Sequence, residues 1–130
     1  MNTEAERQGA PSVLVAEDET MVRLVAVETL RDAGFEVFEA ADGQEALEVL
    51  KTNPGIALLI SDIKMPRKNG YQLVEEGTAL RPALKVMLMT GYAQDPVPDF
   101  IARAGIRVLY KPFNVDDLAV WAQQVLGRKV

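Results

Sequence analysis

The chain has 130 residues, which suits one domain with a single core, and its 48% hydrophobic and 25% charged residues are typical of a globular protein. The net charge is −5 and no stripe of Lys and Arg runs along the chain, which argues against direct binding to nucleic acid. There is no Cys and no His, so thiol chemistry, disulfides and imidazole ligands are excluded, and any bound metal must be a hard cation with oxygen ligands.

Residues 1–11 are polar and lack the apolar stretch of a signal peptide, and nowhere do 18 apolar residues follow one another. We therefore expect a flexible segment over residues 1–11, one domain over residues 12–130, no association with a membrane and a location in the cytoplasm.

The first predicted strand covers residues 12–16, and the acidic triplet Glu17-Asp18-Glu19 follows it directly. Apolar residues at helical spacing then predict a helix over residues 20–33, which Gly34 ends. The expected buried face of this helix comprises Val22, Val25, Ala26, Thr29 and Leu30.

Residues 36–40 form the next predicted strand, and Asp42 is placed to cap a helix over residues 43–51. The continuous apolar run 56–60 is typical of a central strand covered on both faces, and it leads directly into Ser61 and Asp62.

The second half of the chain repeats this alternation. A helix over residues 71–80 is followed by a strand over residues 85–90, a short helix within residues 97–104 and a strand over residues 107–110. A last helix is expected over residues 115–126, with Asn114 and Asp117 in the positions of a capping box.

Five strands alternating with five helices predict an α/β protein with a doubly wound, three-layer (βα)5 architecture and a five-stranded parallel sheet. In such sheets the functional residues lie at the carboxyl ends of the strands. Those ends carry Glu17, Asp18, Asp62, Thr90 and Lys111.

These five residues predict a site for phosphoryl transfer to a carboxylate. Three carboxylates at one sheet edge repel one another, and a divalent cation relieves that repulsion. Mg²⁺ fits best, with Mn²⁺ as the alternative. Asp62 would attack phosphorus, Lys111 would neutralise charge on the transferred oxygens and Thr90 would donate a hydrogen bond to one of them. Read singly, each residue has an ordinary structural interpretation, such as a helix cap or a solvated side chain.

The sequence also resembles the receiver domain of bacterial two-component response regulators, of the single-domain or hybrid-kinase type, from about residue 12 to residue 126. The matching segments are Val13-Leu14-Val15-Ala16-Glu17-Asp18-Glu19, Leu58-Leu59-Ile60-Ser61-Asp62-Ile63-Lys64-Met65-Pro66, Asn69-Gly70, Met89-Thr90-Gly91-Tyr92 and Tyr110-Lys111-Pro112-Phe113.

The resemblance implies a flavodoxin-like fold and a signalling switch that is phosphorylated on Asp62 and catalyses only its own phosphoryl transfer and slow autodephosphorylation. It further implies that Asp18 binds Mg²⁺ directly, that Glu17 acts largely through water, and that the backbone carbonyl of Lys64 is a ligand. Thr90 and Lys111 match the switch hydroxyl and the phosphate-pairing lysine, and the peptide before Pro112 is expected to be cis. The implied partners are a sensor histidine kinase or phosphotransfer protein and a downstream protein target, with the chain a monomer or a phosphorylation-dependent homodimer.

One departure from the family concerns the switching aromatic residue, which commonly lies three positions before the lysine; here Val108 occupies that position and Tyr110 does not. Two other functions fit the architecture. A small phosphohydrolase would need a second acid two residues beyond Asp62, where this chain has Lys64. A flavodoxin-like cofactor binder would need a phosphate-binding loop after the first strand, where Glu17 and Asp18 would repel phosphate.

Overall fold

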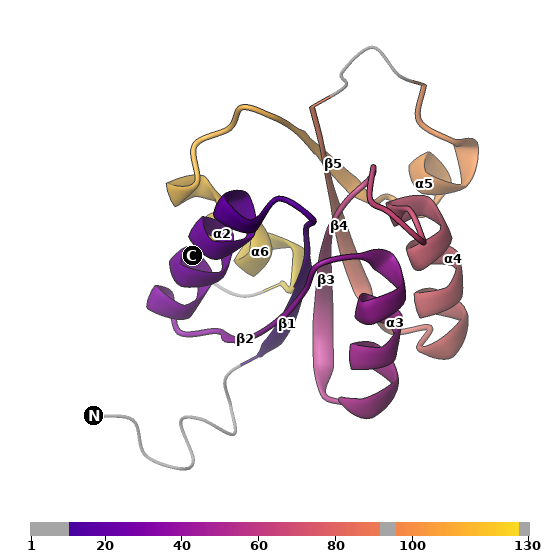
Figure 1. The fold of residues 1–130 in the computed structure, drawn as a ribbon, viewed down its shortest axis with the longest axis horizontal. Helices are drawn as coiled ribbons and strands as arrows, with labels where there is room; N and C mark the ends of the chain where they lie inside the picture. The colour runs from indigo at the N-terminus through magenta and orange to yellow at the C-terminus, as the bar shows by residue number, and fades with distance from the viewer. Residues whose placement is uncertain (1–10, 92–95, 128–130) are drawn as a thin grey trace.

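The computed structural model describes residues 11–91 and 96–127. Five parallel strands form one sheet in the order β2-β1-β3-β4-β5, so the first strand lies inside the sheet and the chain winds outward from it in both directions (Figure 1). This confirms the predicted doubly wound, flavodoxin-like architecture. The strands are β1 (Ser12–Ala16), β2 (Glu36–Ala40), β3 (Ile56–Asp62), β4 (Lys85–Thr90) and β5 (Arg107–Tyr110).

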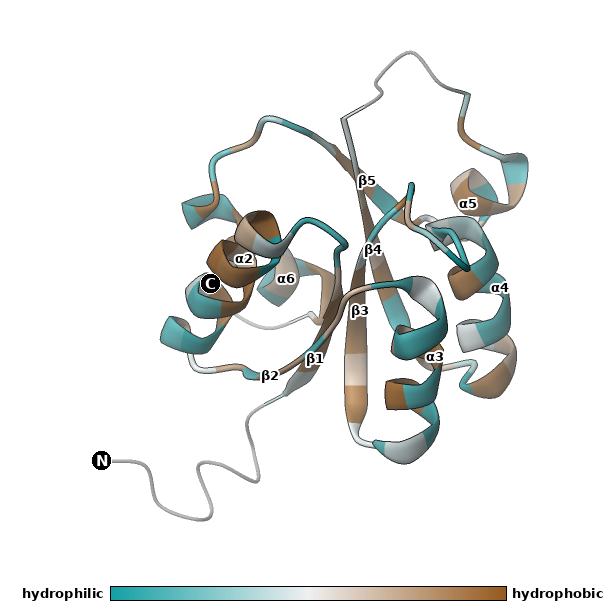
Figure 2. Cartoon of the chain, in the orientation of Figure 1, coloured by the Kyte–Doolittle hydropathy of each residue, from teal (hydrophilic) through white to brown (hydrophobic). Residues whose placement is uncertain are grey.

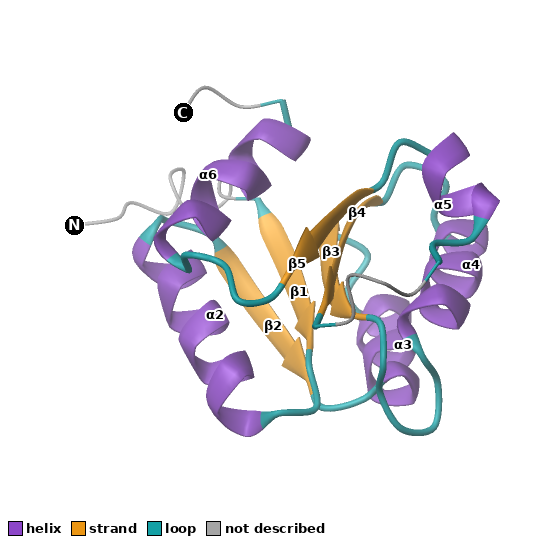
Figure 3. Cartoon of the chain, turned by 90° about the horizontal axis from the view of Figure 1, so that it is seen from above, coloured by secondary structure: helices purple, strands orange, loops and turns teal. Residues whose placement is uncertain are grey.

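The helices cover both faces of the sheet and complete three layers, as the view from above shows (Figure 3). Two helices cover one face and three cover the other. Each connection between parallel strands crosses over one face of the sheet, and the helix in that connection packs on that face. The first face carries α2 (Thr20–Asp32) and α6 (Asp116–Val125), and the second carries α3 (Gly43–Thr52), α4 (Gly70–Leu80) and α5 (Asp99–Arg103).

The sheet divides the hydrophobic core into two clusters. Val13 and Val15 of β1 pack in the cluster under α2 and α6, whereas Leu14 and Ala16 pack in the cluster under α3, α4 and α5. All four are fully buried, because successive side chains of a strand point to opposite faces and helices cover both.

The buried face of α2 differs from the prediction. Ala26 and Leu30 are buried as expected, but Val27 is buried in place of Val25, which is 40% exposed. Apolar residues fill consecutive positions of this helix, so helical spacing alone left two possible faces. Packing against the sheet selects the face that includes Val27, and Val25 remains at the surface together with Met21 and Leu24.

Helix ends also differ in detail from the predictions. Helix α6 begins at Asp116, and the Asn114 side chain accepts a hydrogen bond from the backbone N–H of Asp116 and not from that of Asp117, so the predicted capping box is absent. A capping box not anticipated from the sequence starts α4, where Asn69 and Gln72 each accept a hydrogen bond from the other's backbone N–H. The predicted cap of α3 is confirmed, since Asp42 accepts from the N–H of Glu45 at 2.8 Å.

The segment expected to be flexible lies almost wholly outside the described residues. Among the helices within residues 11–91 and 96–127, none is long and apolar enough to cross a membrane.

Candidate functional site

The predicted site residues meet at the carboxyl edge of the sheet. Hydrophobic strands give way there to hydrophilic loops, most visibly after β1 and β3 (Figure 2). Glu17 and Asp18 follow β1, Asp62 ends β3, Thr90 ends β4 and Lys111 follows β5. The order β1-β3-β4-β5 makes these four strands neighbours, which brings their last residues together.

Three carboxyl groups form a cluster at this edge. One oxygen from each of Glu17, Asp18 and Asp62 lies within 4.8 Å of the other two. Glu17 is fully buried, the Asp62 side chain is 12% exposed and Asp18 is exposed. The cluster therefore has a closed side and an open side, and the open side gives access to Asp62 from solvent.

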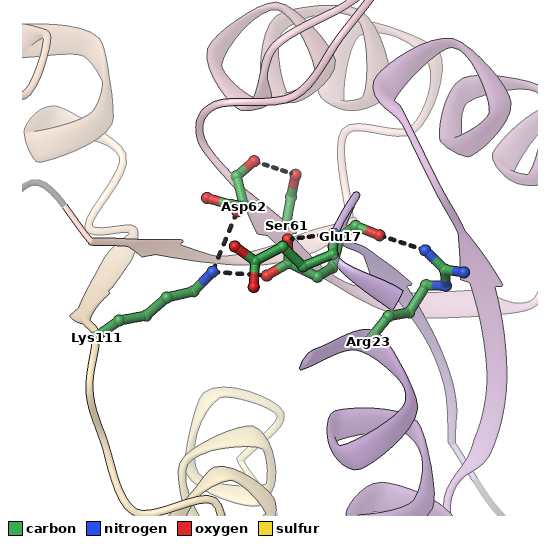
Figure 4. Close-up of polar contacts among 6 residues, drawn as sticks. Glu17, Arg23, Ser61, Asp62 and Lys111 are labelled. Carbon is green, nitrogen blue, oxygen red and sulfur yellow. Dashed lines mark hydrogen bonds and ion pairs between the residues drawn. The ribbon is translucent and has the colours of Figure 1, made fainter. Parts of the chain in front are cut away.

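Lys111 connects two of these acids (Figure 4). Its Nζ lies 2.6 Å from Glu17 Oε1 and 3.2 Å from Asp62 Oδ2. The strand pairing fixes its position, since the Lys111 backbone N–H donates to the Thr90 carbonyl at 2.7 Å. The predicted cis peptide is present between Lys111 and Pro112.

Further hydrogen bonds hold Glu17 in place. Its Oε2 accepts from the backbone N–H of Glu19 at 3.2 Å, and its carbonyl accepts from Arg23 Nη1 at 2.7 Å. Arg23 also pairs with Glu39 at the end of β2. Nothing in the sequence singles out Arg23, because an arginine in the first turns of a helix is usually a solvated residue.

The backbone around Asp62 is equally constrained. The Ser61 hydroxyl donates to the Asp62 carbonyl at 2.8 Å, and the Ile63 N–H donates to the Met89 carbonyl at 3.0 Å. The Gly70 N–H donates to the Ile63 carbonyl at 2.8 Å, and a Cβ at Gly70 would lie 2.5 Å from the Asp62 carbonyl oxygen. Only glycine permits α4 to begin this close to the end of β3.

Burial and charge shift two pKa values at the site. Burial raises the pKa of Glu17 to about 7, and the neighbouring Asp62 carboxyl adds to the rise, although the hydrogen bond from Lys111 opposes it. Burial also disfavours the charged form of Lys111, but its hydrogen bonds and charge interactions with Glu17 and Asp62 outweigh that effect and raise its pKa. One positive charge thus faces an excess of acid groups.

We expect Glu17 to make the stability of the metal-free protein fall as the pH rises. Its pKa is 4.5 when unperturbed and about 7 in the folded chain, so the folded state keeps a proton that the unfolded state has released. This stabilisation is fully present below about pH 4.5. The free energy of unfolding then falls by on the order of 3 kcal/mol as the pH rises through about 7. Denaturant unfolding in EDTA from about pH 4 to pH 8 measures the free energy of unfolding as a function of pH. Glu17→Gln should flatten the profile, and parallel profiles for the two proteins would contradict the assignment.

The acid cluster suits a hard divalent cation. All three side chains offer carboxylate oxygens, and no nitrogen or sulfur ligand competes, because the chain has no His and no Cys. A cation would also relieve the mutual repulsion of the acids. The residues present therefore fit Mg²⁺, the cation expected from the sequence.

The other two predicted residues lie around this cluster. Lys64, with Asp18, Asp62 and Lys111, borders a hollow of about 460 Å³. Thr90 is 5% exposed and faces a second hollow. Tyr92, part of the motif after β4, lies outside the described residues.

A doubly wound fold with three acids, a hydroxyl and a lysine at its carboxyl edge defines a class of α/β switch proteins that accept a phosphoryl group on a carboxylate. The family model described as the response regulator receiver domain matches residues 13–123. The chain therefore belongs to the response regulator receiver family, and it is a phosphorylation-controlled signalling domain of the two-component systems.

Similar proteins agree with this assignment. The response regulator receiver protein CpdR of Brucella abortus (strain 2308) is 36% identical over 115 residues, which cover 88% of this chain and 95% of CpdR. The sensor kinase CckA of the same organism is 35% identical over 123 residues, which cover 93% of this chain but 13% of that protein. A crystal structure of a CheY-like receiver domain protein from Methanospirillum hungatei JF-1 superimposes with a TM-score of 0.83 at 31% identity, covering 92% of this chain and 95% of the other.

Proposed function

We propose that Asp62 accepts a phosphoryl group from a phosphohistidine of a sensor histidine kinase or a phosphotransfer protein, in the cytoplasm, and that the phosphorylated chain binds a downstream protein differently. The observation that carries this proposal is the position of Lys111, which lies within 3.2 Å of Asp62 and 2.6 Å of Glu17 at an open sheet edge. The phosphohydrolase and cofactor-binding alternatives have no comparable support.

The chemistry follows from the side chains. An oxygen of Asp62 forms a bond to phosphorus while the phosphorus–nitrogen bond of the donor breaks and the imidazole keeps the electron pair. Lys111 and the Thr90 hydroxyl would stabilise charge on the transferred oxygens. Glu17, Asp18, Asp62 and the Lys64 carbonyl would hold Mg²⁺, which when bound supplies charge neutralisation. Buried Glu17 positions Lys111, so this lysine stays at the site before any phosphoryl group arrives.

The proposal is tested by treating the purified chain with acetyl phosphate, with Mg²⁺ or with EDTA. We expect one phosphoryl group per chain with Mg²⁺ and almost none with EDTA, and borohydride reduction of the acyl phosphate should place the label at Asp62 by peptide mapping. A label at another residue, or equal labelling in EDTA, would contradict the assignment.

An apolar surface beside the site suits a protein donor. Met21, Leu24 and Val25 of α2 are 69%, 44% and 40% exposed. A hollow of about 400 Å³ between α2 and the segment after β5 is lined by Val25, Phe113 and Lys111 itself, among others. A donor whose phosphohistidine reaches Asp62 must cover the surface around it, and exposed apolar side chains supply much of the binding free energy of an interface.

We expect Val25→Glu to slow phosphotransfer from a cognate phosphodonor protein by about tenfold, because the substitution puts a charge into an apolar contact. Labelling by acetyl phosphate should not change, since the small donor needs no docking surface. Leu80→Glu is the matched control, because Leu80 is 44% exposed but lies on α4, on the other face of the sheet. Equal effects of the two variants on transfer would contradict a donor surface on α2.

A further inference from the structure

The loop after β1 carries two of the three acids of the site, and they are held in different ways. Glu17 is fully buried, so the packing around it fixes its carboxyl group. Asp18 is exposed, so few atoms pack against its side chain, and its carboxylate stays near Glu17 and Asp62 only if the loop backbone is held in place. The orientation of the peptide between Glu17 and Asp18 therefore decides whether three carboxylate oxygens converge on one cation.

Arg23 holds that peptide (Figure 4). Its Nη1 donates to the Glu17 carbonyl at 2.7 Å, and this oxygen belongs to the peptide unit that joins Glu17 to Asp18. Because a peptide unit is planar, a bond to its oxygen also restrains the nitrogen and Cα of Asp18. Beyond Asp18, the Arg23 backbone N–H donates to the Glu19 carbonyl at 2.9 Å. Arg23 thus bonds the loop both before and after Asp18.

The Arg23 side chain is itself anchored on the neighbouring strand. It is 16% exposed, and its Nε lies 3.2 Å from Oε1 of Glu39, the penultimate residue of β2. The Glu17 N–H donates to the carbonyl of Ala40, the last residue of β2, at 3.1 Å. A guanidinium suits this position, because its rigid fork of donors can serve the Glu17 carbonyl and Glu39 at the same time.

The charge of Arg23 does not explain its place beside a cation site. A positive charge near the acids would weaken the binding of a cation, because like charges repel each other. Glu39 offsets this repulsion by pairing with the guanidinium. The hydrogen bonds and the charge of Arg23 therefore have opposite expected effects on cation binding, and a measurement of affinity can separate them.

We propose that Arg23 is a positioning residue for the divalent cation, an inference that rests on the proposed function. By holding the peptide between Glu17 and Asp18, it keeps the Asp18 carboxylate beside Asp62 before the cation binds. Without Arg23 this loop would have to be ordered at the moment of binding, and the conformational entropy lost then would lower the affinity.

The test titrates the full chain with Mg²⁺ by isothermal calorimetry, with no phosphoryl donor present. We expect the Kd for Mg²⁺ to rise about tenfold in Arg23→Met, the low end of the effect of losing a group that orients a metal ligand. Loss of the positive charge alone would lower the Kd. An equal or lower Kd in Arg23→Met would overturn the inference, whereas failure of the parent to bind Mg²⁺ would overturn the proposed cation site as well.

Two further variants separate hydrogen bonding from charge. Arg23→Lys keeps the charge but loses the fork that serves the Glu17 carbonyl and Glu39 together, so the Kd should rise about threefold. An unchanged Kd in this variant would overturn the inference. Arg31→Met is the matched control, because Arg31 is also on α2 and its Nη2 donates to a β2 carbonyl at 3.1 Å, that of Val37, three residues before the end of the strand. Its Kd should stay within about twofold of the parent, and an equal loss of affinity there would overturn the inference.

Labelling by acetyl phosphate separates positioning from a general effect on folding. In Arg23→Met the Mg²⁺ concentration that gives half of the maximal rate should rise about tenfold. The rate at saturating Mg²⁺ should stay within about threefold of the parent, since Asp18 is held in place once it is a ligand. A reduced maximal rate with an unchanged half-saturating concentration would overturn the inference.

Discussion

Replacing Asp62 with Ala is expected to abolish Mg²⁺-dependent labelling by acetyl phosphate and formation of a beryllofluoride adduct. Asp62 is the acid at the end of the central strand, its side chain is 12% exposed and Lys111 Nζ lies 3.2 Å away. Glu17 cannot replace it, because Glu17 is fully buried and its raised pKa keeps part of it protonated near pH 7. The loss should therefore be complete within the limit of the assay, as measured by intact mass.

A loss of folding would give the same result, so stability must be measured in parallel. Removing Asp62 relieves repulsion from Glu17 and Asp18, and in metal-free buffer we expect Asp62→Ala to unfold at an equal or higher denaturant concentration than the parent. Asp32→Ala, at the exposed end of α2, is the control and should be labelled like the parent. Labelling of Asp62→Ala at the parental rate would place the acceptor elsewhere.

Replacing Lys111 with Met is expected to impair both stability and phosphorylation. The substitution leaves fully buried Glu17 and nearly buried Asp62 without their cation, and breaking a buried pair in this way costs about 3 kcal/mol. The loss of unfolding free energy should be larger at about pH 8 than at about pH 6, because Glu17, with its pKa of about 7, is mostly protonated at the lower pH.

The same variant should be phosphorylated more slowly by on the order of 10²-fold, which is typical of losing one group that stabilises charge in a transition state. Rates of labelling by acetyl phosphate and denaturant curves at the two pH values measure the two effects. Lys51→Met is the control, since Lys51 lies on the exposed face of α3. A parental labelling rate in Lys111→Met would remove Lys111 from the proposed chemistry.

Much of the fold could be predicted from the sequence because most strands and helices have a recognisable local pattern of apolar residues and a residue type that marks their ends. β1, β3, β4 and β5 each contain a short apolar run that ends at a polar residue or glycine, whereas β2 has only Val37 and Phe38 between two glutamates. The parallel topology then required the strand ends to meet, so the approach of Glu17, Asp62 and Lys111 could be expected without knowing any distance.

Other features depended on tertiary packing and could not be predicted in the same way. The choice between Val25 and Val27 on α2 is made by the sheet beneath the helix. The bond from Arg23 to the Glu17 carbonyl depends on how α2 returns across the end of β1. The position of Tyr110 beside Thr90 depends on the register between β4 and β5, which spacing from Lys111 alone does not give.

The two-sided sheet has a further consequence for specificity. The exposed apolar residues of α2 belong to one outer layer, whereas α5 belongs to the other, and the sheet lies between the two layers. If α2 carries the proposed donor surface, substitutions on α2 can change which upstream protein is accepted and leave the surface of the opposite layer unaltered. Such a domain can acquire a new donor protein through substitutions in one layer alone.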